Sequence, residues 1–423
     1  MFSRLIAFVR KELAYLNELS ADERKLLSAS VLFGLAQPMI NVFSNTYLWR
    51  QSGNAVVLAV FSIGFYAGLC VGFILNGLGL RRFKPTTLFF LGCVLQGAVP
   101  VLLVYAGASA DELALPLGLM LGVSGGFFWG NRNLLTSTVT SDTDRFKYIS
   151  LDTAFGLGAA IVSPLIIGWF LVFGEKTGLY ATQSAYEVTA VFGFLLLALG
   201  GYSVARIKRK FEKLKGIFLD KRSSAWQKMR LLDFVNGFTD GFERVIPLLI
   251  LLLFLGKEDS IGVVQSAASI LSFLGIYAIG KKAKHKDHAR IIGLWTVVTS
   301  VGKAIFAILY SSAGALIFHG FNGLVLSFRS ASMSAVMFEA VDREPGTGVS
   351  KRYRYIMDRE FVLDIGRVLG LLAFIGLFTY SASFTVRYGL LLSIGTQLLM
   401  VILVKVVTKL VPHEDMSEVE MGR

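Results

Sequence analysis

Two arginines deep inside apolar segments are the residues best placed to do chemistry. Arg132 and Arg329 each lie about ten residues inside an apolar run, which corresponds to about 15 Å of helix. A charge at that depth in a membrane costs about 2.5–3.5 kcal/mol, so we expect both side chains to face a protein interior. Together in one cavity they would bind an anionic group such as a carboxylate or phosphate. Alternatively, each pairs with an interior acid and only holds helices together.

Polar and aromatic side chains accompany these arginines. Trp129 and Asn133 are four residues apart and share a helix face near Arg132. In the first apolar run, Asn41 and its neighbours form a polar stripe, which could orient a ligand or simply make interhelical hydrogen bonds. The predicted substrate-binding residues are Arg132, Arg329, Trp129, Asn131, Asn133, Gln37 and Asn41.

The seventh apolar run contains three charges that can share one stripe. Asp240 precedes Glu243 by three residues and Arg244 by four. A dry cavity favours the protonated carboxyl and a neighbouring arginine favours the carboxylate, so such a group could load and release a proton. We therefore predict that Asp240, Glu243 and Arg244 couple transport to protons; the alternative is a static ion pair. Lys303, in the ninth run, has no obvious acidic partner in the sequence.

Other charges lie at the ends of the apolar runs. Asp364 and Arg367 follow Glu360 on one helix face, where they could join two helices or act as a gate. Basic pairs occupy two of the short loops. The predicted gate residues are Gly77, Arg81, Arg82, Lys281, Lys282, Asp364 and Arg367.

Signatures of metal or covalent chemistry are missing from the sequence. It has two cysteines, Cys70 and Cys93, both in apolar runs, and four histidines outside any Cys/His cluster. No phosphate-binding loop or catalytic triad is present. We therefore expect no metal site, no cofactor and no enzymatic activity.

The composition indicates a membrane protein with many spans. Of the 423 residues, 54% are hydrophobic and only 17% are charged, and the mean hydropathy is +0.62, whereas soluble domains carry about 25% charged residues. Apolar runs long enough to cross a bilayer, about 20 residues, recur along the chain. We predict twelve spans, at 26–49, 54–77, 86–106, 113–140, 149–173, 186–206, 231–255, 260–280, 289–310, 313–340, 359–380 and 384–408.

The distribution of basic residues sets the predicted topology. The net charge is +13, and most Lys and Arg residues lie before the first span, in alternate loops or in the tail. The opposite loops carry Arg50, Lys176, Lys257 and Arg387. This pattern predicts an even number of spans with both termini in the cytoplasm. Because the charges face lipid headgroups from short loops, nucleic-acid binding is not expected.

Landmarks recur in the same order in the two halves. The segment 145–149 resembles 352–356, the loop 80–84 resembles 280–284, and Arg329 follows Arg132 at a comparable separation. A duplicated six-helix unit is typical of transporters that bind their substrate between the repeats. The predicted organisation is an amphipathic N-terminal helix at 1–25, a six-helix bundle at 26–206, a basic linker at 207–230, a second bundle at 231–408 and a tail at 409–423.

These features resemble the major facilitator superfamily. The second loop, Gly77-Leu78-Gly79-Leu80-Arg81-Arg82-Phe83-Lys84, is similar to the family's loop motif but lacks its aspartate. The fifth span contains Ala159-x-x-x-Ser163-Pro164-x-x-x-Gly168, similar to an element of the family's drug–proton antiporters. The resemblance implies an all-α membrane fold of twelve helices, in two six-helix bundles related by a pseudo-two-fold axis.

The predicted function follows from this architecture. We expect a monomeric secondary transporter in a bacterial inner membrane that moves a small amphipathic or anionic solute by alternating access, with proton-coupled efflux. Its partners would be the solute or a lipid, protons and the bilayer. One alternative is a lipid or lysolipid flippase of the same fold. A second is a non-transporting sensor or scaffold, in which the intramembrane charges would be fully paired and no central cavity would exist.

Overall fold

The computed structural model describes residues 16, 18–140, 145–209, 211, 213, 214, 216–219, 221–280, 287–346 and 348–409, and this part of the chain is helical apart from its turns and connections. The first half contains α2 (Ala21–Pro38), the π-helical turn η1 (Met39–Phe43), α3 (Ser44–Ser52), α4 (Ala55–Gly79), α5 (Pro85–Ala106), the 3-10 turn η2 (Gly107–Ser109), α6 (Ala114–Val139), α7 (Arg145–Thr177) and α8 (Thr182–Ala205). The second half contains α9 (Ser224–Phe242), α10 (Ile246–Phe254), α11 (Glu258–Gly280), α12 (His288–Leu309), α13 (Ser312–Arg343), α14 (Gly348–Tyr380) and α15 (Ala382–Lys409).

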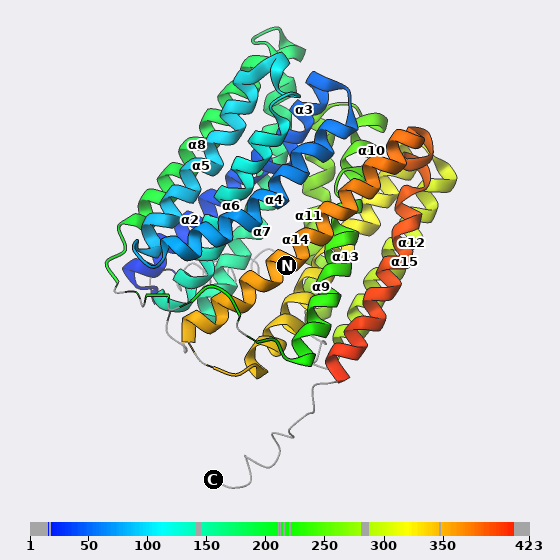
Figure 1. Ribbon diagram of the computed structural model, residues 1–423. Coiled ribbons are helices and arrows are strands. Elements are labelled where there is room, and N and C mark those ends of the chain that lie inside the picture. The colour runs from blue at the N-terminus through cyan, green and yellow to red at the C-terminus, as the bar shows by residue number, and fades with distance from the viewer. Residues whose placement is uncertain are drawn as a thin grey trace, which may run out of the picture.

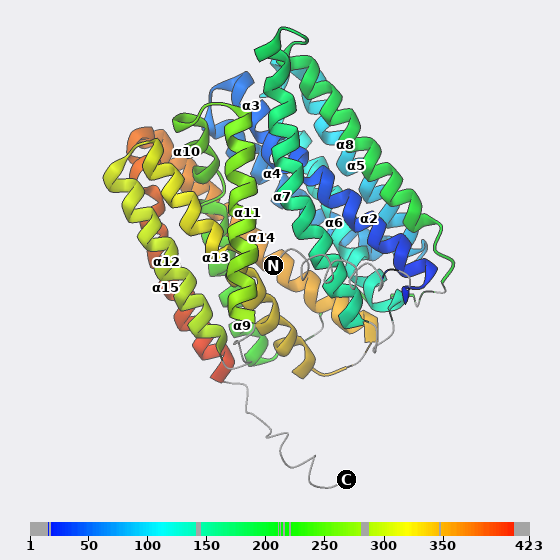
Figure 2. The same cartoon turned by 180° about the vertical axis from the view of Figure 1, so that it is seen from behind.

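The helices form two bundles that repeat one packing pattern (Figure 1). In the first bundle α4 packs on α6, α5 on α8, and α2 on α7 and α8; in the second, α11 packs on α13, α12 on α15, and α9 on α14 and α15. The bundles meet where α4 contacts α14 and where α7 contacts α11. The same grouping is visible from behind in Figure 2. This arrangement confirms the predicted major-facilitator-like fold.

The lengths of the helices suit a membrane. Ten helices in the described residues are long and apolar enough to cross one. The remaining predicted spans correspond to α6, which carries Arg132, and to the pair α9 and α10, which an interruption divides into shorter pieces. The fourth and seventh predicted spans are therefore the ones that fall short of this length or apolar character.

Local sequence signals explain where several helices begin. Ser20 and Glu23 form a capping box at the start of α2, with Ser20 N donating to Glu23 Oε2 at 2.7 Å. Ser223 caps α9 by accepting a hydrogen bond from Trp226 N at 3.0 Å. The predicted linker 207–230 therefore ends in helix. The predicted amphipathic helix lies almost wholly outside the described residues.

Glycines bring the backbones of neighbouring helices together. A Cβ on Gly68 of α4 would lie 2.2 Å from Leu119 O, and one on Gly122 of α6 would lie 2.0 Å from Phe65 O. Gly366 and Gly370 of α14, four residues apart, approach the backbone of α9 in the same way. Helices that approach this closely leave no room for larger side chains between them, so small residues occupy the contact.

Two predicted spans are not continuous helices, which corrects the sequence-based assignment. The first changes to a π-helical turn between α2 and α3, and the seventh unwinds between α9 and α10. Figure 1 shows that α3 and α10, which follow the two interruptions, lie at the same end of the molecule. Both interruptions occur beside a proline, which periodicity of apolar residues alone does not reveal.

Candidate functional site

The interruption in the first span is built by a proline and by side chains that bond to the backbone. Pro38 has no N–H to donate, which loosens the helix around it. Beyond it, Ser44 Oγ donates to Met39 O at 2.6 Å, and Asn45 Nδ2 donates to Asn41 O at 2.6 Å. These bonds satisfy carbonyl groups in the widened turn, so the turn is a stable part of the fold.

The interruption in the seventh span unwinds three residues. Glu243, Arg244 and Val245 separate α9 from α10. Pro247, in the first turn of α10, has no N–H, and its carbonyl lies 3.2 Å from His319 Nε2 of α13. Irregular backbone at membrane depth is tolerated where it is buried in protein or lines a cavity.

The two interruptions line one cavity between the bundles. Its volume is about 170 Å³, room for about five water molecules at roughly 30 Å³ each. Arg244 follows Asn41 by 203 residues, close to the separations of the repeated landmarks. The helix breaks therefore occupy equivalent places in the two repeats. The lining residues are Asn41, Val42, Asn45, Leu58, Ser62, Arg244, Val245, Pro247, Leu248 and Gln265.

Arg244 is the charged residue of this lining. Its side chain is exposed, and its guanidinium carbon lies 5.9 Å from the centre of the Tyr66 ring. Across the described part of the chain, no carboxylate oxygen lies within salt-bridge distance of it. A guanidinium without a carboxylate partner, surrounded by amide and hydroxyl groups, can bind an anion with several hydrogen bonds.

Asp240, in contrast, is held by two arginines of the second bundle. Arg329 of α13 donates to Asp240 Oδ1, and Arg367 Nη2 of α14 lies 3.3 Å from Asp240 Oδ2. Arg367 also donates to Asp364 Oδ1 at 2.7 Å. The guanidinium of Arg329 lies 5.2 Å from the Trp295 ring. These contacts join α9, α13 and α14 into a charged network.

This charged network touches the first bundle through α4. The ring centre of Tyr66 lies 4.8 Å from the Arg367 guanidinium carbon, so Tyr66 lies near both Arg367 and Arg244. Cys70 Sγ donates to Asp364 Oδ2 at 3.5 Å. Any movement of one bundle relative to the other at this level must change these contacts.

Glu243 has a partner that the sequence did not reveal. Lys303 of α12, only 2% exposed, donates to Glu243 Oε1 at 2.7 Å and to Ser393 Oγ at 3.0 Å. Gln397 Nε2 donates to the same carboxylate oxygen at 2.9 Å. Glu243 and Arg244 are adjacent in the chain but differ in their surroundings, since Glu243 pairs within the second bundle and Arg244 lines the cavity.

Arg132 is paired inside the first bundle. Its Nη2 lies 2.5 Å from Asp152 Oδ2 of α7, and its guanidinium carbon is 5.3 Å from the Trp129 ring. Asn131 turns instead to α4, where Nδ2 donates to Asn76 Oδ1 at 2.5 Å. Asn133 is exposed and Gln37 is half-buried. Of the predicted substrate-binding residues, Asn41 lines the 170 Å³ cavity, whereas Arg132 and Arg329 do not; their predicted role in binding stays a prediction.

Of the predicted gate residues, Gly77 lies beside the linker, whereas Asp364 and Arg367 belong to the charged network around Asp240. A Cβ on Gly77 would lie 2.6 Å from Ile217 Cγ2 and 3.0 Å from the Tyr353 ring. Tyr353 Oη of α14 donates to Phe73 O at 2.7 Å and accepts from Asn76 Nδ2 at 3.1 Å, which ties α14 to α4. Arg81 and Arg82 are exposed, whereas Lys281 and Lys282 lie outside the described residues.

Ion pairs close the opposite end, and sequence reasoning did not find them. Glu258, at the start of α11 and 2% exposed, lies 2.7 Å from Arg50 Nε and accepts from Tyr186 Oη at 2.9 Å. Asp259 accepts from Lys176 Nζ of α7 at 2.6 Å. The signal in the sequence was two acids at the start of a span, together with the few basic residues in the loops on the same side.

Two proteins of known sequence are similar to this chain. No family model matches the chain. The chain is 23% identical over 362 residues, 83% of its length, to the uncharacterised protein YqgE of Bacillus subtilis (strain 168), of which the match covers 81%. It is 29% identical over 168 residues, 39% of its length, to an uncharacterised protein encoded in the sodM 3′ region of Geobacillus stearothermophilus, with 77% of that protein covered.

Two solved structures share the architecture over nearly the whole chain. One is a bacterial homologue of the iron transporter ferroportin in an inward-facing state, with a TM-score of 0.64, 15% identity and coverage of 91% of this chain and 98% of that one. The other is a bacterial metal transporter, with a TM-score of 0.59, 13% identity and coverage of 92% and 99%. At these identities the likeness shows the fold.

Several cavity residues were missing from the sequence-based set. Ser62 of α4 and Gln265 of α11 are polar residues in apolar runs. Polar residues inside membrane helices are costly, so their presence was itself a signal. Arg244 was predicted to take part in proton coupling, and the structure places it in the lining of the cavity.

Proposed function

We propose that this protein is a secondary transporter that moves a small anionic solute by alternating access. The observation that carries the proposal is the cavity between the bundles, where equivalent interruptions of two repeated helices meet around Arg244. Substrate sites at interrupted helices between repeats are a recurring arrangement in transporters. The sensor or scaffold alternative is disfavoured, because it requires fully paired intramembrane charges and no central cavity.

The composition of the cavity lining favours an anion. Asn41, Asn45 and Gln265 present amide groups and Ser62 a hydroxyl, all of which can donate hydrogen bonds, and Arg244 adds a positive charge. The cavity volume of about 170 Å³ suits a solute of a few heavy atoms and is too small for an acyl chain beside a headgroup. In this conformation the site therefore favours a small solute over a lysolipid.

A metal cation is the second candidate, because the two similar structures are described as metal transporters. Divalent metals in proteins are bound mainly by carboxylate, imidazole and thiolate groups. In the parts of the chain that the structure describes, no group of three or more such residues is arranged to hold a metal ion. The amide oxygens of the cavity could bind a cation only beside the positive charge of Arg244, which opposes it.

Alternating access requires contacts at the two ends to open in turn. At one end Tyr353 joins α14 to Asn76 of α4, and at the other Glu258 joins α11 to Arg50 of α3. A solute bound at Arg244 would be released when one of these contacts separates. We assign the end of the linker to the cytoplasm, as the distribution of basic residues indicates, in a bacterial inner membrane.

Proton coupling is proposed to involve Glu243. Its carboxylate accepts hydrogen bonds from Lys303 and Gln397, and it lies next to Arg244 in the unwound segment. Movement of the segment on solute release would separate Glu243 from Lys303, so the pairing of this carboxylate would be linked to solute binding. Export of the solute in exchange for protons is the direction that we propose.

The test is uptake and release of solutes in proteoliposomes made with purified protein. Small anions (phosphate, sulfate and mono- and dicarboxylates) and Mn²⁺ are screened first by thermal stabilisation and then by flux. We expect an anion to stabilise the parent against thermal unfolding. The substitution Arg244→Gln should weaken the binding of that anion at least tenfold, since a hydrogen bond to a charged group contributes about 1.5–3 kcal/mol. The matched control is Lys257→Gln, which removes an exposed positive charge outside the cavity. Stabilisation by Mn²⁺ alone, undiminished in Arg244→Gln, contradicts the anion assignment.

A further inference from the structure

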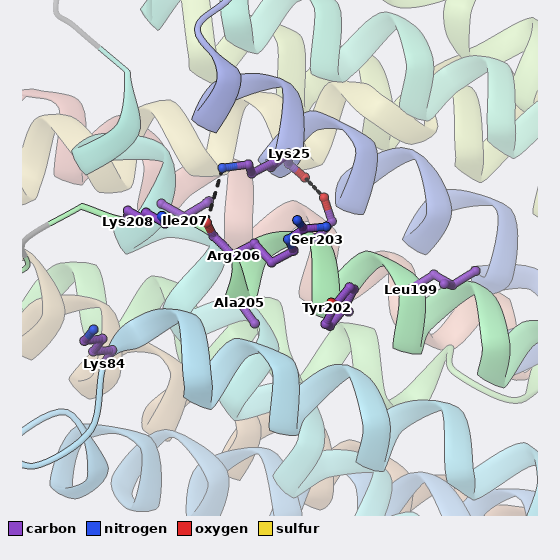
Figure 3. Close-up of a pocket in the computed structure, with 9 residues that line it drawn as sticks. All are labelled: Lys25, Lys84, Leu199, Tyr202, Ser203, Ala205, Arg206, Ile207 and Lys208. Atoms are coloured by element: carbon purple, nitrogen blue, oxygen red, sulfur yellow. Dashed lines mark hydrogen bonds between the residues drawn. The ribbon is translucent and has the colours of Figure 1, made fainter.

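A second pocket, rich in basic side chains, lies at the surface of the first bundle. It has a volume of about 590 Å³ and is formed where the beginnings of α2 and α5 meet the end of α8. Figure 3 shows Lys25, Arg206 and Lys208 around it, with Lys84 at the start of the neighbouring helix. These helix ends lie at the membrane surface that carries most of the basic loops.

The charge of this basic pocket is not balanced by acids. Lys25 Nζ lies 2.8 Å from Asp22 Oδ1 and donates to Arg206 O at 3.2 Å. Among the residues with described positions, Lys84, Arg206 and Lys208 have no carboxylate within salt-bridge distance. The basic pocket therefore carries a net positive charge that a phosphate group could neutralise.

Hydrogen bonds fix the arrangement of the basic pocket before any ligand arrives. Ser203 Oγ of α8 donates to Lys25 O at 3.3 Å and contacts Ser28 Oγ at 3.1 Å. The guanidinium carbon of Arg206 lies 5.6 Å from the Tyr202 ring. These contacts join the beginning of α2 to the end of α8 and so position Lys25 and Arg206 beside each other.

An apolar stripe leads away from the basic pocket along α8. Its exposed residues recur at alternate spacings of four and three, so they lie on one face of the helix. Tyr202 and Leu199 also line the basic pocket, and they are 56% and 58% exposed. The stripe consists of Val188, Phe192, Leu195, Leu199 and Tyr202.

We propose that the basic pocket binds the headgroup of an anionic glycerophospholipid whose acyl chain lies along this stripe. The phosphate would accept hydrogen bonds from Lys84, Arg206 and Lys208, and the apolar stripe would continue the contact into the hydrocarbon. The charge complementarity and the adjoining apolar face together select a lipid over a free anion. Because the headgroup would contact α2, α5 and α8 at once, the bound lipid stabilises the end of the first bundle.

The experiment measures the melting temperature of the purified full chain in detergent. Dioleoylphosphatidylglycerol, dioleoylphosphatidylcholine or inorganic phosphate is titrated into the parent and into Lys84→Gln/Lys208→Gln. We expect phosphatidylglycerol to raise the melting temperature of the parent by several degrees more than phosphatidylcholine does. The pocket variant should need about thirtyfold more phosphatidylglycerol for half of the effect, since it lacks two cations and each surface cation contributes about 1 kcal/mol to the attraction of anionic lipid.

The matched control is Arg343→Gln/Lys405→Gln, which removes two exposed positive charges at the ends of α13 and α15. It should respond to phosphatidylglycerol as the parent does. Native mass spectrometry then counts the phosphatidylglycerol molecules retained, so that a variant with altered stability still gives a reading. An equal response of the pocket variant and the control overturns the proposal, as does equal stabilisation by inorganic phosphate.

Discussion

The charged residues inside this protein differ mainly in whether they form an ion pair with a residue of opposite charge. The sequence predicted the depth of Arg132 and Arg329 in the membrane, because position along a helix is readable from residue counts. It did not predict the partners of these arginines, since Asp152 and Asp240 come from other helices and ion pairing depends on how helices rotate. Arg244 was predicted to take part in proton coupling with Asp240 and Glu243, which stays a prediction, and its place in the lining of the cavity was not predicted.

The buried pair of Lys303 and Glu243 gives a prediction at this scale. Lys303→Met should destabilise the protein by about 3–5 kcal/mol, because it leaves a carboxylate without its buried cation. Removing both charges in Lys303→Met/Glu243→Gln should recover most of that loss. Thermal unfolding of the parent, the two single variants and the double variant measures the coupling. A double variant that is less stable than Lys303→Met would show that the two charges do not stabilise the protein as a pair.

At the scale of the helix, prolines and glycines decide the shape of the elements. Pro38 was visible as an interruption of a polar stripe, yet the π-helical turn after it depends on bonds from Ser44 and Asn45 to the backbone. The unwinding beside Pro247 was not predicted, because the run 246–254 is wholly apolar and reads as uninterrupted helix. Hydropathy thus predicted where the elements cross the membrane but not where they break.

The contact between α4 and α6 can be tested through one glycine. Gly68→Ala should destabilise the protein by about 1–3 kcal/mol, because the added methyl group would lie 2.2 Å from Leu119 O. Gly376→Ala is the control, since a Cβ there meets nothing within 4 Å. Guanidinium or thermal unfolding of both variants measures the difference. Equal stability of the two would mean that α4 and α6 separate more easily than their close packing indicates.

For the molecule as a whole, alternating access requires the contacts between the two bundles to separate at each end in turn. In a background with Cys70→Ala and Cys93→Ala, the pair Asn76→Cys/Tyr353→Cys joined by a short thiol-reactive crosslinker should abolish flux in proteoliposomes. The pair Arg50→Cys/Glu258→Cys should do the same at the other end. Cleavage of a reducible crosslinker should restore the flux, and single-cysteine variants serve as controls. Full flux with either end joined would argue against alternating access.

The duplicated organisation was the part of the whole molecule most accessible to sequence reasoning. Landmarks such as Arg132 and Arg329 recur at a nearly constant separation, and the bundles built around them repeat the same helix contacts. The cavity between the bundles was less predictable, because its lining combines residues from four helices and an unwound segment. These residues come from four separate stretches of the chain, 41–45, 58–62, 244–248 and 265.

Asn41 and Arg244 stand at matching places in the repeats, one neutral and one cationic. A carrier of this kind loaded with a monovalent anion shuttles no net charge at the site, whereas the empty carrier returns with one positive charge. If that charge crossed the full potential, the return step would respond to voltage by about 2.3 kcal/mol per 100 mV. If the protein exchanges a monovalent anion for protons as proposed, the charge on Arg244 would therefore make the return step depend on the membrane potential.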